Sequence, residues 1–220
     1  MHILKKVPVG PLMTNCYLVG NPETKEVLIF DPGAEAKSIK NAIREMGMKP
    51  VAILLTHGHF DHIGAVRSLK LEYDVPVIAG EEEKELLANL GYILPEVFRD
   101  SYPNPEMLPI VPDWSAQHEE LMNLAGMFIT CLHTPGHTEG GYSFFFPTEN
   151  MVISGDTLFM ESVGRTDFPT GSNETLIQSI REVLYELPDE TTVLPGHGPA
   201  TNIGYEKKYN MYTWEKKNIC

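Results

Sequence analysis

The sequence predicts an α/β protein in which two mixed sheets carry helices on their outer faces. Three observations favour this fold class: short apolar runs recur along the chain, amphipathic helical patterns separate them, and no linker-like stretch divides the whole. The chain has 220 residues, of which 42% are hydrophobic, and this is enough for one sizeable core. We therefore expect residues 1–220 to form a single domain.

Strands and helices alternate through the first half of the chain. A first strand and turn, interrupted by Pro8, Gly10 and Pro11, precede them. The segments that follow are a strand at 26–33, a helix at 35–47, a strand at 51–57, a helix with Ile63, Val66 and Leu69 on one face, and a strand at 75–80. This alternation is typical of α/β architecture.

The second half is predicted to return to strands after an irregular interval. Residues 81–90 read as an acidic helix, and residues 95–112 contain five prolines, which suit a solvated connection and a lid equally well. The later segments are a strand at 127–132, two strands joined by the turn at 147–150, a helix at 173–188 and a strand at 191–194. The second half is therefore predicted to contain the same mixture of strands and helices as the first.

Composition excludes several classes of function. The formal net charge of −13 argues against a nucleic-acid partner, because such proteins gather Lys and Arg on one face. No apolar run approaches the roughly 18 residues of a membrane span, so we expect no membrane association. Cys16, Cys131 and Cys220 form an odd set without a CxxC motif, which favours a reducing, cytoplasmic location.

The stretch "LLTHGHFDHIG" concentrates metal-binding side chains directly after an apolar run. His57, His59, Asp61 and His62 all lie within it. Three more candidates each follow another predicted strand: His137 in "HTPGHT", Asp156 in "SGDTLF" and His197 in "PGHGP". Sites in α/β proteins collect in the loops beyond strand ends, so we expect these seven side chains to converge.

The chemistry of these side chains indicates a binuclear metal site. Imidazole and carboxylate ligands suit zinc, iron or manganese, and seven ligands are too many for one tetrahedral ion. Two ions that share a carboxylate and a water could hold a bridging hydroxide near neutral pH. Gly58 would let His57 and His59 converge on one ion, while the adjacent Asp61 and His62 would reach the other.

These four motifs, in this order, resemble the metallo-β-lactamase superfamily over nearly the whole chain. The resemblance implies a four-layer αββα sandwich with the metal site at one edge. It implies a first ion held by His57, His59 and His137, a second held by Asp61, His62 and His197, and a bridge through Asp156. Asp156, where the best-known β-lactam-degrading subclass has Cys, and "GRTDFPTG" resemble a short glyoxalase II-like branch.

The same resemblance suggests supporting residues. Asp31, in "DPG", resembles a position that supports the ligand loop, and a plain turn residue is an equal alternative. His133 is expected to support a ligand and not to be one. Arg165, in "GRTDF", resembles a basic residue near the substrate carboxylate, and a surface arginine in a structural turn is the alternative. Lys207, Lys208, Lys216 and Lys217 could replace missing glutathione contacts or could simply be solvated.

The implied reaction is hydrolysis of a small-molecule thioester, such as S-D-lactoylglutathione, by a metal-bridging hydroxide that Asp61 orients and deprotonates. Two divalent ions, zinc or else iron or manganese, would serve as cofactors. The alternative is a glutathione persulfide dioxygenase with one iron on His57, His137 and Asp156, because that family also carries "GRTDF". A nuclease of the superfamily is disfavoured by the charge. One iron with oxygen uptake, against two metals with none, would distinguish the two leading hypotheses.

Overall fold

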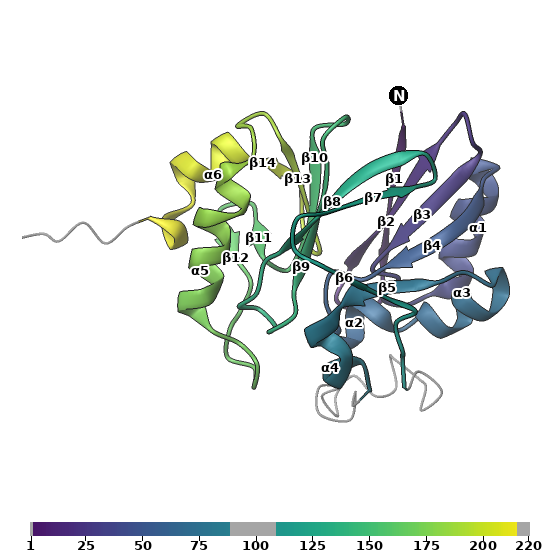
Figure 1. Cartoon of the computed structure of the whole chain (residues 1–220), viewed down its shortest axis with the longest axis horizontal. Helices are drawn as coiled ribbons and strands as arrows, with labels where there is room; N and C mark the ends of the chain where they lie inside the picture. Colours follow the sequence, from purple (N-terminus) through teal and green to yellow (C-terminus); the bar gives the residue numbers. More distant parts are fainter. Residues whose placement is uncertain (1, 89–108, 215–220) are drawn as a thin grey trace, which may run out of the picture.

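Two six-stranded sheets pack face to face in the computed structural model, and helices cover both outer faces (Figure 1). The structure describes residues 2–88 and 109–214. This four-layer αββα arrangement confirms the fold class predicted from the sequence. Residues 95–108 of the proposed lid, together with Lys216, Lys217 and Cys220, lie outside the described residues.

The first sheet is built from the first half of the chain. Its strands, in spatial order, are β1 (Ile3–Val9), β2 (Thr14–Asn21), β3 (Glu26–Phe30), β4 (Lys49–Leu54), β5 (Val77–Gly80) and β6 (Trp114–Ala116). β1, β2 and β3 pair antiparallel, whereas β3, β4, β5 and β6 pair parallel. The helices of this half are α1 (Ala36–Met46), α2 (Phe60–Ile63), α3 (Val66–Tyr73), the 3₁₀ turn η1 (Glu81–Glu83) and α4 (Lys84–Ala88).

The second sheet is built from the second half. Its spatial order is β14 (Thr201–Asn202), β13 (Thr192–Pro195), β10 (Met151–Gly155), β9 (Tyr142–Phe146), β8 (Met127–His133) and β7 (Glu120–Leu124). A separate hairpin joins β11 (Leu158–Phe159) to β12 (Ser162–Val163). The remaining helical segments are α5 (Asn173–Glu182), η5 (Leu184–Glu186), α6 (Ile203–Tyr209) and η6 (Met211–Thr213).

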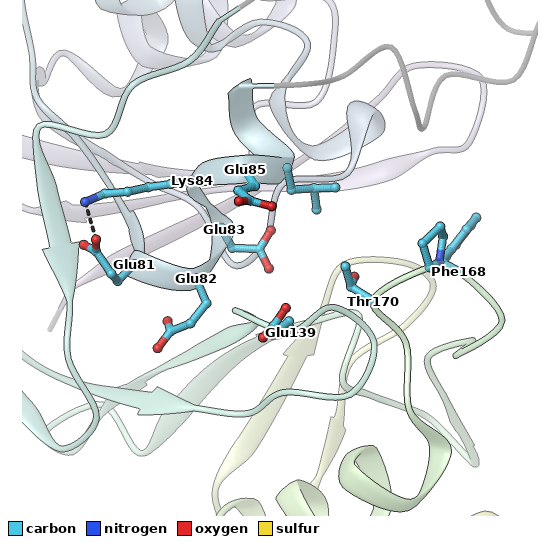
Figure 2. A pocket seen from close by; sticks show the side chains of 10 residues that line it. Glu81, Glu82, Glu83, Lys84, Glu85, Glu139, Phe168 and Thr170 are labelled. Carbon is cyan, nitrogen blue, oxygen red and sulfur yellow. Dashed lines mark hydrogen bonds and ion pairs between the residues drawn. The ribbon is translucent and has the colours of Figure 1, made fainter.

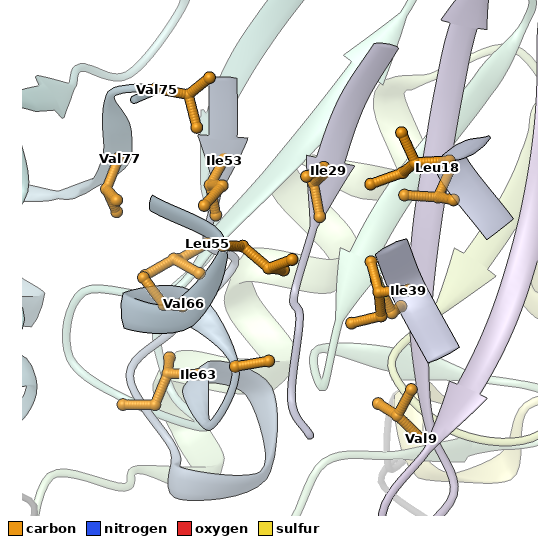
Figure 3. Packing of buried hydrophobic residues seen from close by; sticks show 14 of the residues in the cluster. Val9, Leu18, Ile29, Ile39, Ile53, Leu55, Ile63, Val66, Val75 and Val77 are labelled. Carbon is orange, nitrogen blue, oxygen red and sulfur yellow. The ribbon is translucent and has the colours of Figure 1, made fainter. Parts of the chain in front are cut away.

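Strand alternation divides the apolar side chains among three packed layers. In β3, Leu28 and Phe30 face the second sheet, while Ile29 faces the helices of the first half. Figure 3 shows this helix-covered layer, in which Ile39 of α1 and Val66 of α3 pack toward the sheet. A third layer lies between the second sheet and α5. Side chains on both faces of each sheet are therefore buried, as the near-continuous apolar runs predicted.

The structure differs from the sequence-based expectations at several boundaries. The helix expected after residue 57 is divided into α2 and α3, because the Ala65 N–H donates to the Pro32 carbonyl (2.8 Å) instead of continuing the helical ladder. The helix expected over 173–188 ends at Glu182, and Val183 departs from helical geometry with φ −118° and ψ −60°. The acidic helix at 81–90 begins as the 3₁₀ turn η1.

Candidate metal centre

The seven candidate ligands come from the loops that follow four strands. Those on "HGHFDH" follow β4 or open α2, and the other three follow β8, β10 and β13. β4 belongs to the first sheet and the other strands to the second, so the candidate ligands converge where the ends of the two sheets meet. All seven side chains are buried or partly buried.

Three groups of side chains bring their ligand atoms within 4.8 Å of one another among the described residues. The groups are His57, His59 and His137; Asp61, His62 and His197; and His57, His62 and Asp156. We name the first of these the triple-histidine group and the second the Asp61 group. The third group draws members from both sides of the centre, so the two sites adjoin each other.

Asp156 lies between the triple-histidine group and the Asp61 group. Its Oδ1 is 3.4 Å from His62 Nε2, and its Oδ2 is 3.6 Å from His137 Nε2 and 3.5 Å from His197 Nε2. Because its two oxygens face ligands of both groups, this carboxylate has the geometry of a bridge. Asp61 Oδ2 is placed within the Asp61 group, 3.2 Å from His197 Nε2 and 3.6 Å from His62 Nε2.

Four histidines place Nδ1, the outer ring nitrogen that faces away from the cluster, within hydrogen-bond distance of an oxygen atom. His137 Nδ1 donates to the Arg165 carbonyl (2.7 Å) and His197 Nδ1 to the Leu12 carbonyl (3.1 Å). His62 Nδ1 donates to Asp31 (3.0 Å), and His57 Nδ1 lies 3.0 Å from the Thr56 hydroxyl. A carbonyl can only accept, so the proton stays on the outer nitrogen and the lone pair of Nε2 faces the centre, as metal ligation requires.

Unpaired buried atoms support the fit to a metal. His62 Nε2, His137 Nε2 and Asp156 Oδ1 are buried and have no hydrogen-bond partner within the protein. An unpaired buried polar atom costs free energy, and native proteins rarely leave one without a reason. All three point into the same cluster, where a cation would satisfy them together. The residues present therefore fit a binuclear metal site.

The electrostatics differ between the two sides of the centre. Burial, followed by neighbouring imidazoles, lowers the pKa of His57 well below its ordinary value, and burial beside His137 lowers the pKa of His59 to about 3. Burial also acts to lower the pKa of His62, but the charges of Asp156 and Asp61 outweigh it and raise that pKa. The triple-histidine group therefore offers neutral imidazoles, while the other side pairs imidazole with carboxylate.

Comparison with known proteins identifies the family. The family model described as the metallo-beta-lactamase superfamily matches residues 9–197, which include all seven candidate ligands. This chain belongs to the metallo-β-lactamase superfamily. The resemblance stated from the four motifs is thereby confirmed, and the chain is a metallo-hydrolase of that superfamily.

Curated relatives of this chain cover almost its whole length. The probable metallo-hydrolase YqgX of Bacillus subtilis is 38% identical over 208 residues, which are 94% of this chain and 96% of the relative. The hydroxyacylglutathione hydrolase GloC of Haemophilus influenzae is 38% identical over 207 residues, which are 94% of this chain and 95% of GloC.

Solved structures of the same fold are also similar. The BLEG-1 B3 metallo-beta-lactamase is 34% identical with a TM-score of 0.87, and 96% of this chain and 99% of that chain are covered. The di-iron-bound form of TTHA1623 is 36% identical with a TM-score of 0.80, at 94% and 99% coverage. ETHE1 from Myxococcus xanthus is 26% identical with a TM-score of 0.75, at 95% and 83% coverage.

Asp31 and two threonines hold the ligand segment of this metallo-β-lactamase fold. Asp31 accepts from the Thr56 N–H (2.8 Å), the Thr56 hydroxyl (2.6 Å) and His62 Nδ1 (3.0 Å). The Thr14 hydroxyl donates to Asp61 Oδ2 (2.9 Å). Sequence reasoning did not identify Thr14 or Thr56. Thr56 directly precedes His57, and this position is a usable signal, but nothing in the sequence marks Thr14.

His133 and Arg165 lie farther from the centre. His133 Nε2 contacts the Glu139 carbonyl (3.1 Å), and its ring lies against Tyr142 (5.0 Å), so it supports the loop that follows His137. The Arg165 side chain is exposed, pairs with Asp167 (2.6 Å) and lies 4.4 Å from the Phe168 ring. Only its carbonyl contacts a candidate ligand, through His137.

A cavity of about 540 Å³ lies near the candidate metal centre, and Figure 2 shows the side chains that line it. It lies between the segment at 81–86 and the loop that carries Phe168 and Thr170. The Phe168 ring is 4.8 Å from the His59 ring, so the cavity adjoins the centre. Glu139 and the glutamates of the 81–86 segment make its lining acidic.

None of the helices in the part of the chain that the structure describes has the length and hydrophobicity of a membrane span.

Proposed function

We propose that this protein hydrolyses small-molecule thioesters, such as S-D-lactoylglutathione, at a binuclear metal centre. The observation that carries the proposal is Asp156, whose two oxygens face ligand nitrogens of both adjoining groups. The triple-histidine group would hold one divalent ion, the Asp61 group would hold the other, and Asp156 would bridge them. Zinc is the expected metal, and these ligands would also accept iron or manganese.

Two divalent ions held there would supply Lewis acidity and lower the pKa of a coordinated water. Asp61 is the residue of this chain placed to orient the attacking water, because Thr14 and His197 fix its carboxylate. Burial acts to raise the pKa of Asp61, but the neighbouring His62 outweighs it and keeps that pKa below its ordinary value. Asp61 is therefore ionised at neutral pH, and orienting the water suits it better than strong general-base catalysis.

A thioester substrate fits the side chains around the centre. A thiolate leaves without a strong general acid, so this reaction needs no acid beyond the candidate ligands. The acidic lining of the cavity repels carboxylates, so the carboxylates of glutathione would lie on the side of Arg165. GloC, which is named as a hydroxyacylglutathione hydrolase and is 38% identical, supports the same substrate class.

The test is metal content per chain together with hydrolysis of S-D-lactoylglutathione by the same preparation. We expect two divalent ions and steady release of glutathione, both removed by a chelator and restored by zinc. Two ions without turnover would retain the metal centre and reject this substrate. A β-lactam belongs in the same assay as a comparison substrate, because BLEG-1 is named as a metallo-beta-lactamase.

A second candidate function is oxidation of glutathione persulfide at one iron. The motif "GRTDF" favours it, and the resemblance assigns the two-histidine, one-carboxylate set that suits non-haem iron to His57, His137 and Asp156, of which Asp156 Oδ2 lies 3.6 Å from His137 Nε2. The di-iron-bound form of TTHA1623 shows that a similar chain has been observed with iron. One iron per chain, with oxygen consumed on addition of glutathione persulfide, would favour this function over the hydrolase.

Arg165→Ala is expected to raise KM for S-D-lactoylglutathione about two- to fivefold while kcat changes little. The side chain is exposed and already paired with Asp167, and an exposed charge pair contributes only about 0.2–1 kcal/mol. Steady-state kinetics at low ionic strength would measure the change, with a thioester that lacks carboxylates as the control substrate. An equal loss on both substrates would show that Arg165 acts through the fold and not through substrate charge.

We also propose that residues 1–220 form one domain. The candidate ligands come from both sheets, so neither half of the chain would hold a complete centre alone. Limited proteolysis should yield no stable fragment that retains one sheet without the other.

A further inference from the structure

Glu83 is a buried carboxylate that contacts two ligand-bearing loops at once. Its side chain is 1% exposed. Oε2 accepts the Gly58 N–H (2.7 Å), and Oε1 accepts the Gly140 N–H (3.1 Å) and the Thr138 hydroxyl. Figure 2 shows Glu83 beside the cavity, apart from the ion pair that Glu81 and Lys84 form.

Two of the three donors to Glu83 are direct neighbours of candidate ligands. Gly58 lies between His57 and His59, and Thr138 follows His137. The three members of the triple-histidine group therefore sit on two segments that the Glu83 carboxylate connects. We infer that Glu83 is a positioning residue that sets the geometry of the triple-histidine group and hence the affinity of its metal site. Glu83 has this role only if the proposed metal centre exists.

The Asp61 group is held by other residues. Asp31 contacts His62, Thr14 contacts Asp61, and the Leu12 carbonyl contacts His197. None of the hydrogen bonds of Glu83 reaches these residues. Loss of Glu83 should therefore weaken one metal site and leave the other nearly unchanged. This selectivity separates positioning from a general effect on the fold.

Close packing fixes the contact with both loops. A Cβ on Gly58 would lie 2.9 Å from Glu83 Oε2, and a Cβ on Gly140 would lie 2.6 Å from the Glu83 nitrogen. Gly58 is not among the residues with positive φ, so close approach to Glu83, and not the expected sharp turn, explains glycine between the two histidines. The carboxylate segment and the two loops are consequently in close contact, with no space for a larger side chain at either glycine.

Glu206 provides a matched control within the same chain. It is also fully buried, and its carboxylate accepts from the Thr201 hydroxyl (2.5 Å), the Glu161 N–H (2.9 Å) and Asn210 Nδ2 (2.9 Å). Those donors belong to α6 and its surroundings and not to the triple-histidine loops. Glu206→Gln should therefore reproduce the loss of a buried, hydrogen-bonded carboxylate without the proposed effect on that site.

The experiment measures zinc affinity in chains that retain one site each. His197→Ala removes a ligand of the Asp61 group, and His59→Ala removes a ligand of the triple-histidine group. In the His197→Ala background, Glu83→Gln should weaken zinc binding about 10- to 100-fold, the usual cost of losing a supporting partner of a ligand. In the His59→Ala background the change should stay within about threefold. Competition with a chromophoric chelator gives both constants without any assay of activity.

Each outcome decides the role of Glu83. Equal losses in both backgrounds, or an equal loss from Glu206→Gln, would overturn it in favour of a general structural role. If Glu83→Gln does not fold, Thr138→Val replaces it, since it removes one donor and should still weaken zinc about 3- to 10-fold in the His197→Ala background alone. Unchanged affinity there would equally overturn the role. The unsubstituted chain must bind two zinc ions. Binding of fewer than two ions would reject the proposed metal centre itself. Failure to hydrolyse the thioester would reject only the proposed substrate.

Discussion

Asp156→Asn is expected to lower kcat/KM for the thioester on the order of 1000-fold, roughly 4 kcal/mol of transition-state stabilisation. Asparagine has the same shape, so the change isolates the charge that lies between the two metal groups. It would also turn an amide N–H₂ toward an imidazole nitrogen or leave only one oxygen as a ligand. With Asp61 alone to offset two divalent ions, the chain should lose at least one of them.

Metal content and kinetics measured on the same preparation would test this. Asp189→Asn is the matched control, because that carboxylate is exposed and pairs only with Lys207, so both readouts should stay at their original values. A variant at Asp156 that keeps two ions and more than about a tenth of the original turnover would contradict the bridging role. The metal-free chain should unfold at a lower temperature, since the charges of His62, His137 and His197 outweigh desolvation and hold the pKa of Asp156 below its ordinary value.

The candidate ligands could be predicted from the sequence because each is a distinctive residue type at the end of an apolar strand. "HGHFDH" follows one buried run, and glycine-flanked histidines or aspartates follow three more strands, a combination typical of metal ligands. The structure brings all seven together. The supporting residues could not be predicted in this way, because Thr14 and Glu83 are ordinary side chains whose importance comes from tertiary contacts across 47 and 25 residues.

The central strands of the layered fold were also predictable from their residue types, but the edge strands of the two sheets were not. Buried strands such as β3 and β4 are apolar on both faces, so composition marks them even without a partner. β6 and β7 lie at sheet edges and carry exposed residues such as Trp114 and Leu121, so they have no comparable pattern. β14 has only two residues, and its pairing with β13 depends on the tertiary structure.

Asp31 shows how local strain and function coincide. Its φ is +46°, an uncommon value for a residue other than glycine, and its carboxylate holds Thr56 and His62. Such conformations persist where the surrounding structure enforces them. The "DPG" turn is therefore more than a chain reversal. Its last residue, Gly33, lies against the backbone of the segment that carries Asp61, and this contact can be tested.

Gly33→Ala is expected to destabilise the chain by about 3 kcal/mol, at the upper end of overpacking costs, and to disrupt the Asp61 group. A Cβ on Gly33 would lie 1.6 Å from the Asp61 carbonyl oxygen and 2.7 Å from its carbonyl carbon. Both are backbone atoms, so no rotamer change relieves the clash. The start of α2 must move away from the turn at Asp31, and His62 would lose its fixed partner.

Gly47→Ala separates this steric effect from the general cost of replacing a glycine. Gly47 has φ +64°, and a Cβ added there would meet no atom within 4 Å, so alanine should cost about 1 to 2 kcal/mol through the backbone alone. For a chain of this size, the Gly33 variant should unfold roughly 6–12 °C lower than the original in the metal-free state. The Gly33 variant should also bind only one zinc ion firmly, at the triple-histidine group. The Gly47→Ala variant should still bind two. Equal melting temperatures and two ions in both variants would mean that the turn yields without moving the ligands, and that Asp31, not Gly33, fixes their position.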